Sequence, residues 1–378
     1  MKKAQRLFMV VNVDWFFLSH RLPVALAAKA AGYDVTIVTC DTGRGNEIKS
    51  HGLNFIDLPF KRSGTNIMYE MKCIRLLREV YRKHKPDLLH HVTIKVALYG
   101  SIAARLSQAG GVVNAISGLG YNFTGDRKGF TQKVLLMMMK FGFKQKNMHF
   151  IFQNEDDINT FKSLNLVEDR QVSLIKGSGV NLQEFTATPL GPVNGKVKVV
   201  LPARMLYDKG VMEFIEAARL LKNQLQDKAE FILAGDVDKE NLAAIPHEKI
   251  HALMDGNYLR WIGFQKDMVS LLQAADIVVL PSYREGLPKS LIEAAAIGRP
   301  IITTDVPGCK ECVVDGYNGF LVPAKDEHRL AEAMLELIKN RELQVEMGQH
   351  SRILAEKEFS IDKVIKETTA IYSALTLN

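Results

Sequence analysis

The sequence predicts an α/β protein of two domains, each a parallel sheet covered by helices. Two observations carry this prediction. Short apolar runs alternate with segments of 3.6-residue apolar spacing, and the alternation stops once and then restarts. The length of 378 residues suits two domains of this kind. The break falls at 186–196, which holds two prolines and two glycines and is predicted to be a linker.

The first half is predicted to be one alternating series. Strands are expected at Leu7–Val13, Val35–Thr39, Leu53–Leu58, Asp87–His91, Gly111–Ile116, His149–Gln153 and Gln171–Ile175. Helices are expected at Arg21–Ala31, Met68–Lys83, Ile94–Ser107 and Asn154–Leu164. Because parallel strands need crossover connections, helices should cover both faces of the sheet. His90 and His91 are consecutive in one strand, so they must face opposite sides of it.

The second half repeats the pattern. Strands are expected at Val197–Ala203, Ala229–Ala234, Leu259–Ile262, Ile277–Pro281 and Pro300–Thr303. Helices are expected at Val211–Leu225, Lys289–Ile297, Glu327–Lys339, Glu342–Glu358 and Ile361–Leu375. The predicted domains are therefore 1–185 and 197–358, and the C-terminal helix, 359–378, should cross back to the first domain. Ligands of such sheets bind at the carboxyl ends of the strands.

Composition and charge limit the possible functions. Hydrophobic residues make up 47% and charged residues 24%, which excludes a disordered chain, collagen and a disulfide scaffold. Four cysteines and no apolar run of about 18 residues predict a cytoplasmic protein, soluble or peripheral at a membrane. Residues 1–180 hold 26 Lys/Arg against 14 Asp/Glu, and 181–378 hold 23 against 28. The basic first half suggests an anionic partner: nucleic acid, a membrane surface or a phosphate-rich substrate.

The strongest motif runs from Glu285 to Glu293, directly after a predicted strand. Pro288 suits the start of a helix, so Gly286 and Leu287 form the turn before it. Free N–H groups at a helix N-terminus attract anions, and carboxylates accept hydrogen bonds from sugar hydroxyls. The segment therefore predicts a site for a phosphorylated sugar. A surface glutamate followed by one on a helix face would have the same spacing.

Two cations follow the first strand of the second half, Arg204 at its end and Lys209 before the next helix. Two cations at this spacing suit a diphosphate leaving group, and solvated loop charges are the alternative. Together with the glutamate pair, this pattern resembles the retaining glycosyltransferase family four. That family has the GT-B architecture of two facing Rossmann-like domains. The resemblance spans nearly the whole chain, and the segments KGSGVN at 176–181, WIGF at 261–264 and DGYNGF at 315–320 agree with it.

The resemblance implies a role for each residue of the second half. Arg204 and Lys209 would bind the donor diphosphate, and Glu285 would contact the transferred sugar; these three are the implied catalytic residues. Glu293 would bind the ribose, and the backbone at 263–264 would hold the base. No metal and no cofactor are implied. The implied donor-binding residues are Arg204, Lys209, Gly263, Phe264, Glu285, Gly286, Leu287, Pro288 and Glu293.

The first half narrows the resemblance to bacterial enzymes that extend polyprenyl-diphosphate-linked saccharides, including N-acetylgalactosaminyltransferases that act on undecaprenyl-diphosphate saccharides. The segments 14–23, 90–95 and 117–121 are similar to theirs, although many relatives have a histidine where this chain has Ser117. The implied acceptor-binding residues are His20, Arg21, Lys95, Ser117 and Gly118.

A basic segment at 128–146 predicts a helix that is apolar nearly all round. Lys133, Lys140 and Lys144 form a narrow stripe on it. Such a helix is either a core helix whose lysines reach solvent or a membrane-surface helix. We favour contact with an anionic membrane or a lipid diphosphate, made by Lys128, Lys133, Lys140 and Lys144.

Two other patterns are interpreted as incidental. Cys309-x2-Cys312 resembles half of a zinc or redox site, but the other two cysteines offer no second pair. Asp236-Val-Asp238 resembles a metal-binding Asp-x-Asp, and we interpret it as a loop. The sequence has no Walker loop and no nucleic-acid-binding module, so nucleic acid is not an expected partner.

The sequence therefore predicts a retaining, metal-independent glycosyltransferase in bacterial polysaccharide or glycan assembly. It would move a hexose or N-acetylhexosamine from a UDP-sugar to a polyprenyl-diphosphate saccharide, at the cytoplasmic face of the inner membrane. One alternative is a UDP-N-acetylhexosamine 2-epimerase of the same architecture, for which a membrane-type helix would have no purpose. The other is a non-catalytic nucleotide-sugar-binding membrane protein, which would not need both glutamates and both cations.

Overall fold

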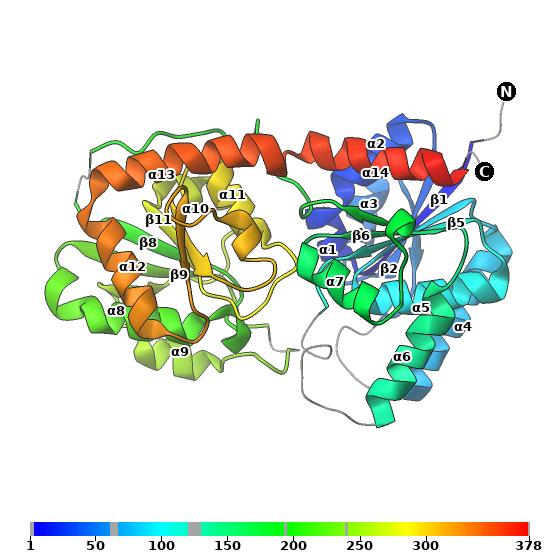
Figure 1. Ribbon diagram of the computed structural model, residues 1–378, viewed down its shortest axis with the longest axis horizontal. Helices are drawn as coiled ribbons and strands as arrows, with labels where there is room; N and C mark the ends of the chain where they lie inside the picture. Colours follow the sequence, from blue (N-terminus) through cyan, green and yellow to red (C-terminus); the bar gives the residue numbers. More distant parts are fainter. Residues whose placement is uncertain (1–3, 61–66, 120–129, 193–194, 239–240, 377–378) are drawn as a thin grey trace. The chain divides into compact units, whose positions relative to one another are not determined.

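The computed structural model describes residues 4–60, 67–119, 130–192, 195–238 and 241–376 (Figure 1). The chain forms two compact units. The first consists of 1–178 together with 362–378, and the second of 179–361. The described residues of the segment 179–196 therefore pack with the second unit.

The first unit is built on a seven-stranded, wholly parallel sheet. The strand order is β3-β2-β1-β4-β5-β6-β7, so the direction of winding reverses between β1 and β4. Such a reversal opens a crevice at the carboxyl ends of the two strands. The strands are β1 (Arg6–Val13), β2 (Asp34–Cys40), β3 (Asn54–Asp57), β4 (Leu88–Val92), β5 (Gly111–Ile116), β6 (Met148–Phe152) and β7 (Val172–Leu174).

Helices cover both faces of this sheet. Buried side chains of α4, α5, α6 and α7 form one apolar cluster on one face. On the other face, Tyr372 of α14 contacts His90 of β4, and its ring lies 6.0 Å from that of Tyr33. The C-terminal helix thus packs on the first unit, as predicted. The helices are α1 (Asp14–His20), α2 (Leu22–Ala30), α3 (Gly45–Ser50), α4 (Ile67–His84), α5 (Ile94–Ser107), α6 (Phe130–Phe143), α7 (Glu155–Ser163) and α14 (Ile361–Thr376).

The second unit has a six-stranded parallel sheet of order β10-β9-β8-β11-β12-β13, which reverses between β8 and β11. Two apolar clusters lie against its two faces. The strands are β8 (Val197–Pro202), β9 (Ala229–Ala234), β10 (Leu259–Trp261), β11 (Ile277–Leu280), β12 (Ile301–Thr304) and β13 (Gly319–Val322). The helices are α8 (Val211–Leu225), α9 (His247–Leu253), α10 (Met268–Ala274), α11 (Lys289–Ile297), α12 (Glu327–Lys339) and α13 (Arg341–Leu354).

Helix α11 shows how local sequence fixes an element that carries the motif. Pro288 is its N-cap, and Gly298 ends it in the left-handed conformation at φ 85°. The residues between are mostly alanine, leucine and isoleucine, and Leu291–Ile297 is buried throughout. A helix buried on every side cannot shift, so the turn before it is held rigidly.

The predicted parallel α/β fold is confirmed. For the majority of the predicted helices and strands, the first and last residues lie within one or two positions of those in the structure. The predicted helix Glu342–Glu358 is instead α13 followed by a π-helical turn at Ala355–Phe359. The prediction missed α1, α3, α9, α10 and β13. Each of these is seven residues or shorter, too short for a periodic apolar pattern to show.

Candidate functional site

The first group of predicted site residues lies at the carboxyl edge of the second sheet. Gly210, at φ 71°, brings the loop after β8 against the end of β11, since a Cβ there would lie 2.1 Å from the carbonyl oxygen of Pro281. This contact places Lys209 beside the loop between β11 and α11. Lys209 Nζ donates to the carboxylate of Glu285, and the two side chains are only 18% and 13% exposed.

Backbone contacts hold Glu285 in place. Its N–H donates to the carbonyl of Pro307 at 3.0 Å. Gly308 packs so closely on the same segment that a Cβ would lie 2.3 Å from the carbonyl oxygen of Glu285. The carboxylate is therefore positioned by its neighbours before any ligand binds.

The first turn of α11 supplies the rest of the motif. Leu287 is buried, Gly286 precedes it, and Pro288 is the N-cap, so the backbone N–H groups at the start of α11 lie next to Glu285 in the chain. Glu293 is 5% exposed and pairs with Lys289 at 3.1 Å. Burial raises the pKa of Glu293, and the charge of Lys289 opposes that shift.

Arg204 has a partner that the sequence did not reveal. Its Nη1 donates to Oδ2 of Asp238 at 2.5 Å, and the guanidinium remains 42% exposed while the carboxylate is 12% exposed. The interpretation of 236–238 as a loop is correct, since it follows β9. The ion pair between this loop and Arg204 could not be predicted, because 34 residues separate Arg204 from Asp238.

The predicted base-binding backbone lies at the same edge. Gly263 has φ 68°, and its carbonyl accepts a hydrogen bond of 2.8 Å from the N–H of Gly235, in the loop after β9. Phe264 is 72% exposed. The structure thus brings together at one sheet edge the residues predicted to bind the donor.

A buried carboxylate that the sequence did not single out organises the first sheet's edge. Asp14 begins α1, directly after β1, and is fully buried. It accepts hydrogen bonds from the N–H and hydroxyl of Thr42, both at 2.6 Å, and from the N–H groups of Arg44 and Trp15. Burial alone would raise the pKa of Asp14, but these hydrogen bonds outweigh it and lower the pKa. Asp14 therefore fastens the loop after β2 to α1.

His20 and Arg21 differ in exposure. The ring of His20 stacks on Phe16 at 4.1 Å, and its Nδ1 lies 2.6 Å from the hydroxyl of Ser19. Arg21 is 5% exposed, near Tyr372 and His90, and burial lowers its pKa to about 10. Its Nε has no hydrogen-bond partner, and no carboxylate in the described part of the chain pairs with it.

Lys95 follows β4, which lies beside β1 in the sheet, and Ser117 and Gly118 follow β5, the next strand along. Lys95 Nζ lies 2.7 Å from the carboxylate of Glu70. Thr93, just before α5, has φ 77°, a strained conformation for a β-branched residue. All the predicted acceptor residues thus belong to segments that follow β1, β4 and β5.

The two consecutive histidines of β4 face opposite sides of the sheet, as predicted. His91 Nε2 lies 2.9 Å from the hydroxyl of Tyr81, and its Nδ1 lies 2.9 Å from Oδ1 of Asn114. Burial lowers the pKa of His91 to about 4 and that of His90 well below its ordinary value. Both histidines are therefore neutral core residues.

Two lysines of the predicted stripe, Lys133 and Lys140, lie on α6, whereas Lys144 comes directly after its last residue, Phe143. Lys133, Lys140 and Lys144 are exposed, whereas Lys128 lies outside the described residues. Between the lysines, Met137 and Phe141 are 66% and 44% exposed, and the opposite face of α6 is buried. Helix α4 packs on α5, and α5 packs on α6. The other exposed large apolar side chains in the described residues of the first unit lie on α4 and α5, and they are Met68, Met71 and Leu106.

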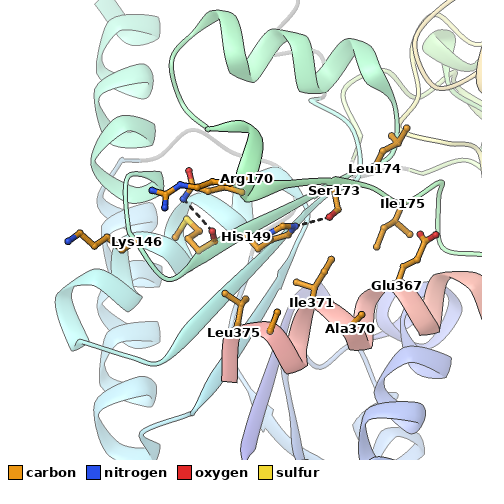
Figure 2. Close-up of a pocket in the computed structure, with 13 residues that line it drawn as sticks. Lys146, His149, Arg170, Ser173, Leu174, Ile175, Glu367, Ala370, Ile371 and Leu375 are labelled. Carbon is orange, nitrogen blue, oxygen red and sulfur yellow. Dashed lines mark hydrogen bonds between the residues drawn. The ribbon is translucent and has the colours of Figure 1, made fainter. Parts of the chain in front are cut away.

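A cavity of about 670 Å³ lies away from these residues, against β6, β7 and α14 (Figure 2). Its wall includes His149, whose Nε2 lies 2.8 Å from the hydroxyl of Ser173, and Ile371 and Leu375 of α14. None of the predicted site residues lines it.

The two cysteines of the Cys-x2-Cys pattern, Cys309 and Cys312, are fully buried, and burial raises the pKa of Cys309 to about 12. No group of three or more potential metal ligands occurs among the described residues.

Comparison with known proteins identifies the two halves separately. The family model "Glycosyl transferases group 1" matches residues 183–353, and "Glycosyl transferase 4-like" matches 6–154. The N,N'-diacetylbacillosaminyl-diphospho-undecaprenol alpha-1,3-N-acetylgalactosaminyltransferase of Campylobacter jejuni is 29% identical, over 93% of this chain and 98% of its own. The UDP-Gal:alpha-D-GlcNAc-diphosphoundecaprenol alpha-1,3-galactosyltransferase of Escherichia coli is 24% identical, over 92% and 90%.

Solved structures agree on the fold. A glycosyltransferase from Rickettsia africae superposes with a TM-score of 0.78, at 17% identity and full coverage of both chains. Anabaena Alr3699/HepE in complex with UDP superposes with a TM-score of 0.77, at 17% identity, over 98% of this chain and all of its own. These similarities confirm the predicted GT-B fold.

Proposed function

Since the chain is a member of the glycosyltransferases with a GT-B fold, we propose that it transfers a sugar from a UDP-sugar to a polyprenyl-diphosphate-linked saccharide. Two full-length relatives are named as transferases that act on undecaprenyl-diphosphate-linked sugars, and one of them is named for a UDP-Gal donor. A structural neighbour was solved with UDP. The pathway would be assembly of a bacterial polysaccharide or glycan.

The charged site at the edge of the second sheet is the observation that carries this proposal. Lys209 and Glu285 meet there, next to the backbone N–H groups at the start of α11. A cation and helix-end amides suit a diphosphate, and the carboxylate suits the hydroxyls of a sugar. A nucleotide-sugar donor needs these groups at one place.

The roles of the residues follow from the charge that develops when the glycosidic bond to the diphosphate breaks. Lys209 and Arg204 stabilise the leaving diphosphate. Negative charge grows on the diphosphate in the transition state, so preorganised cations bind the transition state more tightly than they bind the ground state. Glu285, once released from Lys209, accepts hydrogen bonds from the sugar, and Glu293 binds the ribose. The reaction proceeds with retention: the departing phosphate takes the acceptor's proton, and no metal is required.

The acceptor binds at the carboxyl edge of the first sheet. The segments that follow β1, β4 and β5 contain His20, Lys95, Ser117 and Gly118. Asp14 holds the loop after β2 against α1, which is the helix that contains His20. Arg21 is buried, has no carboxylate partner among the residues that the structure describes, and supports the site from the buried side.

The exposed face of α6 lies on an anionic membrane, where the lipid-linked acceptor is held. Met137 and Phe141 enter the headgroup boundary, and Lys140 and Lys144 contact lipid phosphates. No helix among the described residues has both the length and the apolar character needed to cross a bilayer. The proposal places the enzyme at the cytoplasmic face of the membrane.

The test of function is transfer of label from UDP-[14C]sugars to a polyprenyl-diphosphate saccharide, measured in the organic phase. Glu285→Gln should abolish transfer, whereas Glu216→Gln, which removes an exposed glutamate paired with Arg219, should not. An epimerised donor in the absence of acceptor would instead indicate an isomerase. If neither lipid labelling nor donor conversion occurs with any UDP-sugar, the proposed activity is wrong.

The test of membrane contact is flotation with liposomes that contain 30% anionic lipid, at low salt. The double variant Lys140→Glu/Lys144→Glu should lose binding because like charges repel the surface. Lys222→Glu, on the second unit, should bind like the unaltered protein. Equal flotation of all three proteins would exclude α6 as the membrane contact.

A further inference from the structure

The loop after β8 carries a carboxylate, Asp208, with no role in the reaction described above. Arg204 pairs with Asp238, and Lys209 pairs with Glu285, so both cations are already neutralised. Asp208 remains. These five side chains carry two positive and three negative charges, which sum to one negative charge. A dianionic diphosphate therefore enters a cluster that is negative before it arrives.

Asp208 is held in this cluster by its backbone. Its carbonyl accepts a hydrogen bond of 2.9 Å from the N–H of Tyr283, in the loop between β11 and α11. Its Oδ1 is shielded from solvent and has no hydrogen-bond partner. A buried carboxylate oxygen without a donor is costly while it is charged, and the cost disappears when the group is protonated.

The charged groups around Asp208 come from three elements. Lys209 adjoins it, Arg204 lies on the same loop, and Glu285 faces it from the loop before α11. From that loop Tyr283 also faces Asp208, and its hydroxyl donates to Glu213 of α8. Lys325 lies 4.9 Å from the centre of the Tyr283 ring. Burial raises the pKa of Asp208 and Glu285 adds to that rise, while Lys209 and Arg204 oppose it.

We propose that Asp208 is a further donor-binding residue, which takes up one proton from solvent when the diphosphate binds and then donates a hydrogen bond to it as a neutral carboxyl. The proton adds to the carboxylate, no covalent bond of the donor changes, and the proton returns to solvent when UDP leaves. The inference rests on the proposed function, because it assumes that the diphosphate occupies this edge of the sheet.

The physical reason is like-charge repulsion. Arrival of the diphosphate places at least two negative charges near a carboxylate that is already poorly solvated, which favours its protonated form. The neutral carboxyl has an O–H, which can donate to a phosphate oxygen, whereas the carboxylate can only accept. One proton therefore converts a repulsive contact into an attractive one. The amides at the start of α11 favour the anion at any pH, so they do not produce this coupling.

The linkage has a definite sign. The pKa of Asp208 is higher with the diphosphate bound than without it. Between these two values, the affinity for UDP falls by up to tenfold for each unit that the pH rises. Above the higher value the affinity becomes constant again. UDP's own ionisation also changes with pH, so the informative quantity is the ratio of affinities between the unaltered protein and a variant.

Isothermal titration calorimetry with UDP from pH 5 to 8 tests the inference. Asp208→Asn is always neutral, so the ratio of its affinity to that of the unaltered protein should rise with pH. At one pH, titrations in two buffers of different ionisation enthalpy should show net proton uptake by the unaltered protein and less uptake by Asp208→Asn. Asp238→Asn, the matched control in the same cluster, should keep the proton uptake.

Two outcomes separate the failure of this inference from the failure of the proposed function. If the unaltered protein binds UDP without taking up protons, the role of Asp208 is wrong and the donor site stands. The same conclusion follows if its affinity ratio to Asp208→Asn is constant with pH. If the unaltered protein does not bind UDP at all, the proposed donor site itself is wrong.

Discussion

Replacing Lys209 by methionine should remove most of the activity. Its Nζ contacts Glu285, and its side chain is 18% exposed, so the lost charge acts in a poorly solvated place. A charge-assisted hydrogen bond is worth about 1.5–3 kcal/mol, or roughly 10- to 150-fold. A donor aimed at developing charge is worth about 10²–10³ in turnover. Because the site is shielded from solvent, we expect Lys209→Met to lower kcat/KM by about 10²- to 10³-fold.

The same change should also affect stability. Without Lys209, the carboxylate of Glu285 loses its cation while only 13% exposed. Leaving a buried charged group unpaired lowers the free energy of unfolding by about 3–5 kcal/mol. In the double variant Lys209→Met/Glu285→Gln the uncompensated charge is gone, so stability should recover in part and activity should not.

Steady-state transfer and urea denaturation measure the two effects. Lys222→Met is the matched control, since Lys222 pairs with Asp255 at 2.8 Å but is 44% exposed. It should change kcat/KM by less than twofold. If Lys209→Met retains kcat/KM within fivefold of the unaltered enzyme, Lys209 does not stabilise the leaving group and the reasoning fails.

Three further predictions concern positions outside the ion pair. Gly308→Ala should lower kcat/KM more than Gly316→Ala, as measured in steady-state assays. A Cβ at position 308 would lie 2.3 Å from the carbonyl oxygen of Glu285, whereas a Cβ at position 316 would have no atom within 4 Å. Asp14→Asn should raise KM for the acceptor and leave the Kd for UDP unchanged, because it loosens only the loop after β2; an unchanged acceptor KM would contradict it. For His91, whose buried pKa is about 4 against an ordinary 6.5, the unfolded state binds the proton first as pH falls. Its contribution to the free energy of unfolding is constant above pH 6.5 and should fall by about 3 kcal/mol down to pH 4. His91→Asn should flatten this decline in urea denaturation, and an equal slope in both proteins would show that His91 is protonated in the fold.

The fold could be predicted largely from apolar periodicity. Ile94–Ser107 and Lys289–Ile297 were predicted with the bounds observed, because each is a long apolar segment with a clear stop. Helix α1 was missed because Trp15, Phe16 and Phe17 are consecutive and give no helical period. Its position depends on Asp14, whose partners lie about 30 residues away.

The site could be predicted only in part. The residue types at 204, 209, 285 and 293 indicated a diphosphate and a sugar. However, the pairing of Lys209 with Glu285 joins positions 76 residues apart, and it exists because β8 and β11 are neighbours in the sheet. Local sequence does not determine the order of strands in a sheet. It therefore could not predict that Arg204 pairs with Asp238 or that one carboxylate oxygen of Asp208 has no hydrogen-bond partner.

The most direct test of the central claim is the stoichiometry of one reaction. UDP released and sugar transferred to the lipid are measured together, with and without a polyprenyl-diphosphate saccharide. Sugar transfer from the donor site predicts one UDP for each sugar on the lipid, no rapid UDP release without acceptor, and neither product with Glu285→Gln. Donor conversion that is independent of acceptor, with no sugar on the lipid, would contradict the account.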